Sequence, residues 1–525
     1  MNKVEQFSRR TFFNKISEYE IKKVINSSRA LNPLSRLSKQ LRKSLPPIES
    51  EVLFLNRSSF GIRPNDYNRI KSIGIENYLE EQLDYQQIDN SELELTLASV
   101  YPLVALTIPE LFAYIQEGNA QGEDRVLDAA IQLISTTMLR QIYSPQQLFE
   151  VMVEFWTNHF NTDIAKGLDL IFKTHEDREI IRPHSLGGFR QLLQADAKSS
   201  TMMFYLDNHT NTKFGPNENY ARELMELHTL GVGGGYSEDD VKEVARCFTG
   251  WSIGENEDGY FQFYQENHDF NPKTVLGNNI DNSDGIKDGE QVLDILADSS
   301  STASFIAKKL VRRFVSDNPD IQLVRSVAKS FLSTDGDIKS MLRTIFHSTQ
   351  FLSSVDDKFK RPIEFVSSMF RAIDAESSHT TVSQKFEPLR ILIDEYETGG
   401  QTPFLWAPPT GYPDVESYWA NASSLLRQIN LTNGVALAEL PYYRGNGFNR
   451  YSDYIDYDYE VLFTDINTAS EVIDTIESAI IYREMLENDR QVLIDFLLTE
   501  GEIISEQRIR AVIGIVLSST YFVLR

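Results

Sequence analysis

Cysteine is nearly absent from the sequence, since Cys247 is the only one among 525 residues. A disulfide within the chain is therefore excluded. Cys247 falls in the segment VKEVARCF, on the same side of the expected helix as Val244. A cysteine in such an apolar position is more often a small buried residue than a nucleophile, so we do not expect thiol catalysis.

The sequence also lacks an uninterrupted apolar run long enough to cross a membrane. The most apolar stretch, Thr96–Pro109, is interrupted by Pro102 and followed by Glu110. We therefore expect no transmembrane segment.

Positive charge is scarce, because the net charge at pH 7 is −25. Such an excess of negative charge repels phosphates and argues against nucleic-acid binding. Residues 1–45 are the exception, with eleven Lys or Arg and three Asp or Glu. Within them, SRRTFFNK at Ser8–Lys15 is similar to a twin-arginine export signal, but the apolar core of such a signal does not follow. Residues 1–47 are thus either a basic arm or a degenerate twin-arginine-like leader, and both an exported and a cytoplasmic location stay open.

Two familiar motifs, one of metal binding and one of phosphate binding, are missing as well. The sequence contains no His-Glu-x-x-His. Gly233-Gly234-Gly235 is not followed by the Lys-Ser/Thr of a phosphate loop. Glu223 and His228 are five residues apart, which places them about 140° apart around a helix and off a common face. A metal site would have to be assembled from separate parts of the chain.

Most of the sequence has the spacing of apolar residues that is typical of α-helices. Apolar residues recur three and four positions apart in many segments, for example at Leu127, Ala130, Ile131, Ile134 and Met138. Around Gly259, apolar and polar residues alternate, which predicts a short hairpin. We therefore predict a mainly α-helical protein, with one large multi-helix domain and a small β-hairpin near 251–264. The expected divisions are a helical core over 48–435, a tyrosine-rich irregular excursion over 436–465, and C-terminal helices over 466–525 that pack on the core.

The densest group of polar residues lies in Pro216–Trp251. On a helix over 217–230, four of them share roughly a third of the circumference at about 100° per residue: Asn219, Arg222, Glu223 and Glu226. Such a stripe is usually the solvated face of a helix. If this helix is buried in a large domain, the stripe is instead a structural ion network or a functional site.

The same stretch, NENYARELMELHTLGVGGGYSEDDVKEVARCFTGW, resembles the signature of a bacterial family called domain of unknown function 1800. Other segments are similar to the same family, among them LNRSSFG, EFWTNHF, IRPHSLGGFRQLL, HDFNPKTVLG, KKLVRRFVSDNP and PPTGYPD. The resemblance covers most of the chain from about 50 to 435 and the final helix. It implies no established reaction, but members of the family resemble exported proteins whose genes often neighbour a sulfatase/phosphatase-like family.

The polar residues of these motifs define a candidate site. General acid–base catalysis would fall to Glu223, Glu226 and Asp269, with Arg182 and Arg222 orienting the substrate or the carboxylates. Further binding residues would be Asn217, Asn219, His184 and Lys273. A divalent metal, if one binds, would be held by His159 and His268.

Two functions are compatible with this set of residues. The first is a hydrolase-like or polymer-modifying enzyme of the cell envelope, with the Glu, Arg and His residues around one pocket. The alternative is a non-enzymatic envelope assembly or accessory protein that acts with a sulfatase/phosphatase-like partner. An open, concave pocket would favour the enzyme, whereas sealed and mutually paired side chains would favour the accessory protein.

Overall fold

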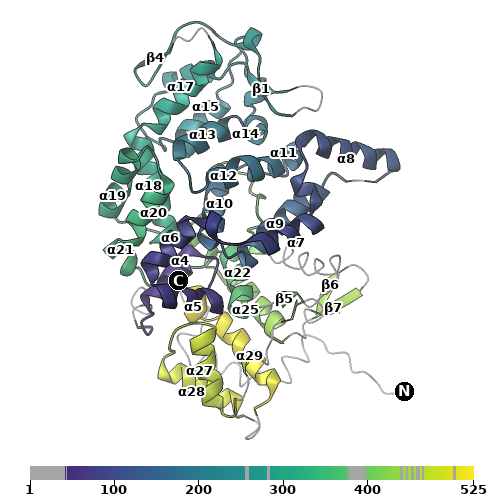
Figure 1. Ribbon diagram of the computed structural model, residues 1–525, viewed down its shortest axis with the longest axis vertical. Coiled ribbons are helices and arrows are strands. Elements are labelled where there is room, and N and C mark those ends of the chain that lie inside the picture. Colours follow the sequence, from purple (N-terminus) through teal and green to yellow (C-terminus); the bar gives the residue numbers. More distant parts are fainter. Residues whose placement is uncertain are drawn as a thin grey trace.

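The computed structural model describes residues 42–525 apart from positions 43, 124, 375 and 398 and the segments 255–258, 281–283, 378–395, 438–440, 445–446, 451–454, 457–461, 464–465 and 500–503. The described part is mainly α-helical, as predicted (Figure 1). Within these ranges, no helix has both the length and the apolar character that a membrane crossing requires. The basic segment over 1–47 lies almost entirely outside the described residues.

In the first half of the chain, α10 lies near the middle of the view in Figure 1 and packs against α4, α6 and α9. Their apolar faces meet in one large core, in which Leu148, Met152 and Trp156 of α10 are fully buried. A smaller apolar cluster joins α8 to α11 through Ile108 and Phe172. The helices are α4 (Ser50–Ser58), α5 (Pro64–Ile73), α6 (Ile75–Leu83), α7 (Ser91–Val100), α8 (Ile108–Gln121), α9 (Asp128–Tyr143), α10 (Gln147–His159), α11 (Asp169–His175), α12 (Arg182–His184), α13 (Phe189–Ala197), α14 (Ser200–Tyr205), α15 (Asn219–Glu223) and α16 (Glu238–Cys247).

The predicted hairpin is present. Strands β1 (Trp251–Ile253) and β2 (Phe261–Phe263) pair antiparallel, with Trp251 opposite Phe263. A second pair, β3 (Lys273–Val275) and β4 (Asn278–Ile280), follows it. The helices that come next are α17 (Ile286–Ala297), α18 (Ser300–Phe314), α19 (Ile321–Ser333), α20 (Ile338–Phe346), α21 (Thr349–Leu352) and α22 (Pro362–Ala372).

The tyrosine-rich segment is more regular than expected where it is described. Strands β6 (Pro441–Arg444) and β7 (Gly447–Arg450) form an antiparallel hairpin, so the expectation of irregular structure is wrong for these residues. Strand β8 (Ile455–Asp456) pairs with the distant β5 (Glu376–Ser377). The remainder of the expected excursion lies outside the described residues.

The C-terminal helices lie against the rest of the fold at the lower end of Figure 1. Helix α29 packs on α25, and a Cβ at Gly514 would lie only 2.7 Å from Oδ1 of Asn433. The missing side chain therefore permits the close approach of the two helices. The helices of this region are α24 (Glu416–Trp419), α25 (Ala422–Leu437), α27 (Ala469–Ala479), α28 (Glu487–Leu497), α29 (Glu506–Leu517) and α30 (Thr520–Val523).

A buried ion network joins distant parts of the chain at Glu364 of α22. Glu364 is 2 % exposed, and its carboxylate forms ion pairs with Arg361 at 3.0 Å, Arg313 at 2.8 Å and Arg525 at 2.7 Å. Fully buried Arg57 of α4 donates to the main-chain oxygens of residues 314, 315, 354 and 525. Four segments of the chain therefore depend on a single cluster of charges.

Candidate functional site

The central polar stretch does not form the regular helix over 217–230 that its spacing predicts. Helix α15 ends at Glu223, and a π-helical turn, η5 (Leu224–His228), replaces the second half. A second π-helical turn, η3 (Glu176–Ile181), links α11 to α12. π-helical turns are rare in proteins, and those that occur are often found at functional sites.

The stripe on α15 and η5 is a half-exposed ion network. Arg222 donates two hydrogen bonds to Glu238, at 2.9 and 2.8 Å, and one to Glu218 at 3.2 Å. Glu226 lies 3.8 Å from the guanidinium of Arg222. Glu223 is half-buried, and burial, followed by the nearby charge of Glu226, raises the pKa of its carboxyl.

Asn217 and Asn219, at the N-terminal end of the stripe, form hydrogen bonds with the backbone. Oδ1 of Asn217 accepts the main-chain N–H of Asn219 at 3.0 Å, and Nδ2 of Asn219 donates to the carbonyl of Leu206 at 3.1 Å. The amide groups of both predicted binding residues are therefore engaged with the chain itself.

Replacing Arg222 with glutamine is expected to lower the free energy of unfolding by about 1 kcal/mol or less, because half-exposed ion pairs contribute little. Urea denaturation of the variant and of wild type measures the difference. A loss of several kcal/mol would contradict this view of the stripe as a solvated network.

Asp269, His268 and Lys273 belong to a second cluster, together with Asp288. Nδ1 of buried His268 donates to the carbonyl of Thr249 at 2.7 Å, and its Nε2 lies 3.2 Å from Oδ2 of Asp288. Lys273 donates to the same Asp288 oxygen at 2.6 Å. Both ring nitrogens of His268 therefore face groups of the chain itself.

Asp269 is held in its charged form. Burial opposes this charge, but hydrogen bonds from Arg246, at 2.8 Å, and from Asn271 outweigh it and lower the pKa of Asp269 to about 2. A carboxylate with so low a pKa is a poor general acid or base near neutral pH.

Arg182, His184 and His159 form contacts in a third region. Arg182 donates two hydrogen bonds to buried Glu150, at 3.1 and 2.6 Å, and His184 pairs with the carbonyl of Ile180 at 2.7 Å. His159 uses Nε2 toward the carbonyl of His228 at 3.0 Å and Nδ1 toward the amine of a lysine at 2.7 Å. In the part of the chain that the structure describes, no group of three or more His, Cys, Asp or Glu residues is arranged to hold a metal ion.

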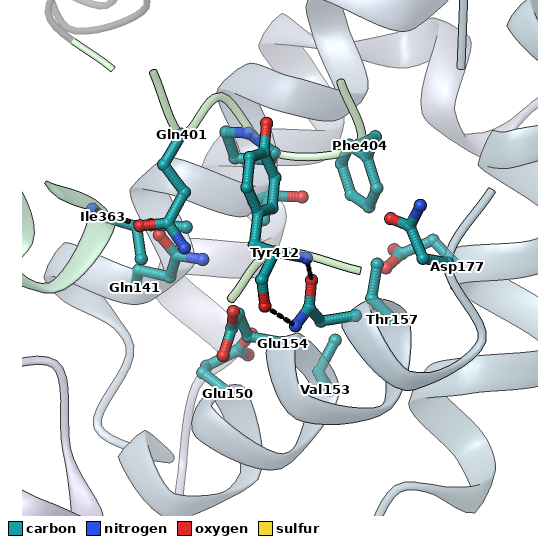
Figure 2. Close-up of a pocket in the computed structure, with 14 residues that line it drawn as sticks. Gln141, Glu150, Val153, Glu154, Thr157, Asp177, Ile363, Gln401, Phe404 and Tyr412 are labelled. Carbon is teal, nitrogen blue, oxygen red and sulfur yellow. Dashed lines mark hydrogen bonds between the residues drawn. The ribbon is translucent and has the colours of Figure 1, made fainter. Parts of the chain in front are cut away.

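The predicted site residues are thus divided among three groups of contacts, and none of them lines the pocket that Figure 2 shows. That pocket lies between α10 and the loop over 401–412 (Figure 2). Its volume is about 30 Å³, which has room for about two water molecules. Its walls come from α9, α10, η3, α22 and the loop, through residues Thr137, Gln141, Glu150, Val153, Glu154, Thr157, Asn158, Asn161, Asp177, Ile363, Gln401, Pro403, Phe404 and Tyr412.

The loop over 401–412 is fastened to α10 by an asparagine. Nδ2 of Asn158 donates to the carbonyl of Tyr412 at 3.0 Å, and Oδ1 accepts the N–H of Tyr412 at 2.6 Å, as the dashed lines of Figure 2 show. Gly411 has φ +71°, and a Cβ there would lie 2.0 Å from the carbonyl oxygen of Asn158. Only glycine fits this approach. Phe404 also has a positive φ of 66°, a strained conformation for a bulky residue that is typical of functional loops.

Four buried polar atoms on the pocket walls have no hydrogen-bond partner in the structure: Thr137 Oγ1, Gln141 Oε1, Asp177 Oδ1 and Gln401 Nε2. An unpartnered buried donor or acceptor costs about 1–3 kcal/mol. Several such atoms around one cavity indicate that water or a ligand supplies the missing partners.

The carboxylates of the pocket differ in how their charges are balanced. Arg361 donates to both oxygens of Glu154, at 3.0 Å each, and Arg182 balances Glu150. Asp177, which is 4 % exposed, keeps Oδ1 without a partner. Figure 2 places Glu154 below Tyr412 and Asp177 to one side of it.

Behind Phe404 lies a cluster of buried acids. Lys173 forms an ion pair with Glu176, donates to Thr162 at 2.5 Å and lies 5.6 Å from the centre of the Phe404 ring. Both carboxyl oxygens of Asp169 lack partners; burial, with Glu176 second, raises the pKa of Asp169 to about 9. Burial likewise raises the pKa of Glu176 and that of Asp196.

The motifs that contribute residues to this pocket were recognised in the sequence, but the sequence did not indicate that they line a common pocket. Glu154 and Asn158 lie in EFWTNHF, and Tyr412 lies in PPTGYPD. The signal available in the sequence was the density of acids in HEDREIIRPH, which holds Asp177.

Comparison with known proteins is informative at the level of the family. No curated protein and no solved structure matches the chain. The profile of one family, described as a protein of unknown function, matches residues 53–524, which is nearly the whole chain. The chain therefore belongs to the DUF1800 family.

Proposed function

We propose that the protein is an envelope hydrolase that cleaves a polyhydroxylated polymer, a glycan, in the pocket beneath the loop over 401–412. The observation that supports this proposal is the set of four unpartnered polar atoms on its walls, one of them on a carboxylate. A hydroxyl group both donates and accepts, so it satisfies the Gln401 donor and the Gln141 acceptor alike. A polyol therefore fits the lining better than an apolar ligand does.

Glu154 and Asp177 would share the chemistry. A pair of carboxylates in contrasting environments is a common basis for acid–base catalysis. Glu154, whose two carboxylate oxygens accept hydrogen bonds from Arg361, would take a proton from the water that attacks the sugar carbon. Asp177 would give its proton to the departing oxygen as the C–O bond breaks. Arg182 forms an ion pair with Glu150 and also interacts electrostatically with Asp177. It would therefore position these two carboxylates.

Substrate entry would require the loop to move, because a pocket of about 30 Å³ has room only for water. Gly400, with φ +78°, stands at one end of the loop and Gly411 at the other. Loops that close over a substrate exclude bulk water and complete the site. The water-sized cavity would then be the resting position of the attacking water.

Replacing Asp177 with asparagine is expected to reduce the rate of glycan cleavage about 10²- to 10⁴-fold, because proton donation is lost while the shape is kept. Replacing Glu154 with glutamine should have a comparable effect. The measurement is the release of reducing ends from isolated bacterial cell-wall glycan. The matched control is Glu238→Gln, a carboxylate outside the pocket, which should cleave at the wild-type rate.

The alternative function, a non-enzymatic accessory of a sulfatase/phosphatase-like protein, is favoured by one observation. The side chains of Arg222, Asp269 and Lys273 are engaged with partners of their own chain. On this alternative, wild type releases no reducing ends, and wild type and Asp177→Asn change the activity of the partner enzyme equally. That pair of results would reject the hydrolase.

A further inference from the structure

Two cations on α18 have no carboxylate partner among the residues that the structure describes, in a protein whose net charge is −25. Lys309 and Arg312 are half-buried, and within the described residues neither forms an ion pair with a carboxylate. Nε of Arg312 is buried and has no hydrogen-bond partner. The adjacent Arg313, by contrast, is paired with Glu364 at 2.8 Å. Half-buried cations in so acidic a chain are expected to find carboxylates, so their isolation calls for an explanation.

The hydrogen bonds of His159 define how Lys309 is held. The carbonyl of His228 can only accept, so Nε2 of His159 carries the proton that it donates across 3.0 Å. Nδ1 is then a lone pair, and it accepts from the amine of Lys309 at 2.7 Å. A charged lysine has three N–H donors, so two remain for another ligand.

His228 provides a further unused donor beside Lys309. It is 1 % exposed, and neither ring nitrogen has a partner. Its ring centroid is 6.1 Å from that of His159. Burial first, and the charge of Lys309 second, lower the pKa of His228 to about 3, so the ring is neutral and carries one N–H.

We propose that Lys309, Arg312 and His228 form a binding site for a small oxyanion: a sulfate, phosphate or carboxylate group, either free or part of a larger ligand. An oxyanion would accept from the ammonium of Lys309, from the guanidinium of Arg312 and from the ring N–H of His228. It would also balance two cations that form no ion pair with a carboxylate of the described residues. The ring of half-buried Phe305, 5.6 Å from the amine of Lys309, provides an apolar wall. The site is independent of the proposed hydrolase pocket, whose lining shares none of these residues.

Binding at this site would be linked to proton uptake. Burial, followed by the charge of Arg312, lowers the pKa of Lys309 to about 7. The other groups that face Lys309 are His159 of α10, His228 of η5 and Asp414, which raises this pKa but is itself paired with Lys358 at 2.8 Å. A bound anion favours the ammonium form, so at pH 8 binding should take up close to one proton.

The test is calorimetric titration of the full-length protein with sulfate at pH 8, in two buffers of different ionisation enthalpy. Sulfate does not titrate near this pH, so any proton uptake belongs to the protein. Wild type is expected to bind saturably with uptake of about one proton. Lys309→Gln should bind at least tenfold more weakly without uptake. Arg312→Gln should bind more weakly with reduced uptake, because the charge of Arg312 helps to lower the pKa of Lys309. The neighbouring exposed lysine supplies the control, Lys308→Gln, which should match wild type.

Three results would overturn the proposal: no saturable binding by folded wild type, equal affinity in all three variants, or binding without proton uptake. Circular dichroism of each variant confirms that it is folded. A parallel titration with acetate distinguishes the two ligand classes. Sulfate binds more tightly if the site takes a tetrahedral oxyanion, and acetate binds more tightly if it takes a carboxylate.

Discussion

Replacing Glu364 with glutamine is expected to lower the free energy of unfolding by about 3–5 kcal/mol, because it leaves buried arginines without their counterion. Three guanidinium groups, those of Arg313, Arg361 and Arg525, converge on this one carboxylate within 3.0 Å. Burial opposes the charge of Glu364, but the three arginines outweigh burial and hold its pKa well below the usual range. The glutamine keeps the size of the side chain and removes only the charge.

Urea denaturation of Glu364→Gln and of wild type measures this loss. The control is Glu80→Gln, which removes an exposed carboxylate that also pairs with an arginine, Arg343, and should cost about 1 kcal/mol or less. Equal effects of the two substitutions would mean that the buried network contributes no more than a surface ion pair.

Replacing Asp169 with asparagine is expected to stabilise the protein increasingly as pH rises from about 4 to about 9. The pKa of Asp169 is raised to about 9 in the folded protein, chiefly by burial, against about 3.9 in an unfolded chain. Between these values the folded state binds more protons than the unfolded state, so the free energy of unfolding falls as pH rises. The asparagine does not titrate and removes this dependence.

The expected difference between Asp169→Asn and wild type changes by about 1 kcal/mol per pH unit, in favour of the variant at pH 8. Denaturation in urea at pH 5, 6.5 and 8 measures it. Asp239→Asn, at a carboxyl side chain that is 88 % exposed, is the control and should show no such trend. A variant that is less stable than wild type at pH 8 would show that Asp169 is charged and paired in the folded protein.

Local features of the fold were predictable from the sequence because their partners are near in the chain. The alternation around Gly259 predicted the hairpin in which Trp251 pairs with Phe263, twelve residues away. Helical spacing predicted that Arg222 and Glu226 would be neighbours. It could not predict Glu238 as the main partner of Arg222, because that contact depends on how α16 folds back on α15.

The pocket and the ion network could not be predicted, because their partners are far apart in the sequence. Asn158 meets Tyr412 across 254 positions, and Arg361 meets Glu154 across 207. Periodicity reports which face of a helix is apolar, but it carries no information on which distant segment covers that face. For the same reason Asp288, a helix residue with no distinguishing pattern around it, was not recognised as the partner of Lys273.

The contacts of Arg57 have a consequence for how the protein is made. Its guanidinium binds the carbonyl of residue 525, 468 positions along the chain, and Phe359 pairs with Leu524. Such contacts give the fold a high contact order around its first described helix, and contacts between distant segments form slowly. Until residue 525 has been synthesised, α4 lacks the partners that complete its surroundings. The core around Arg57 can therefore close only after the chain has been translated through residue 525.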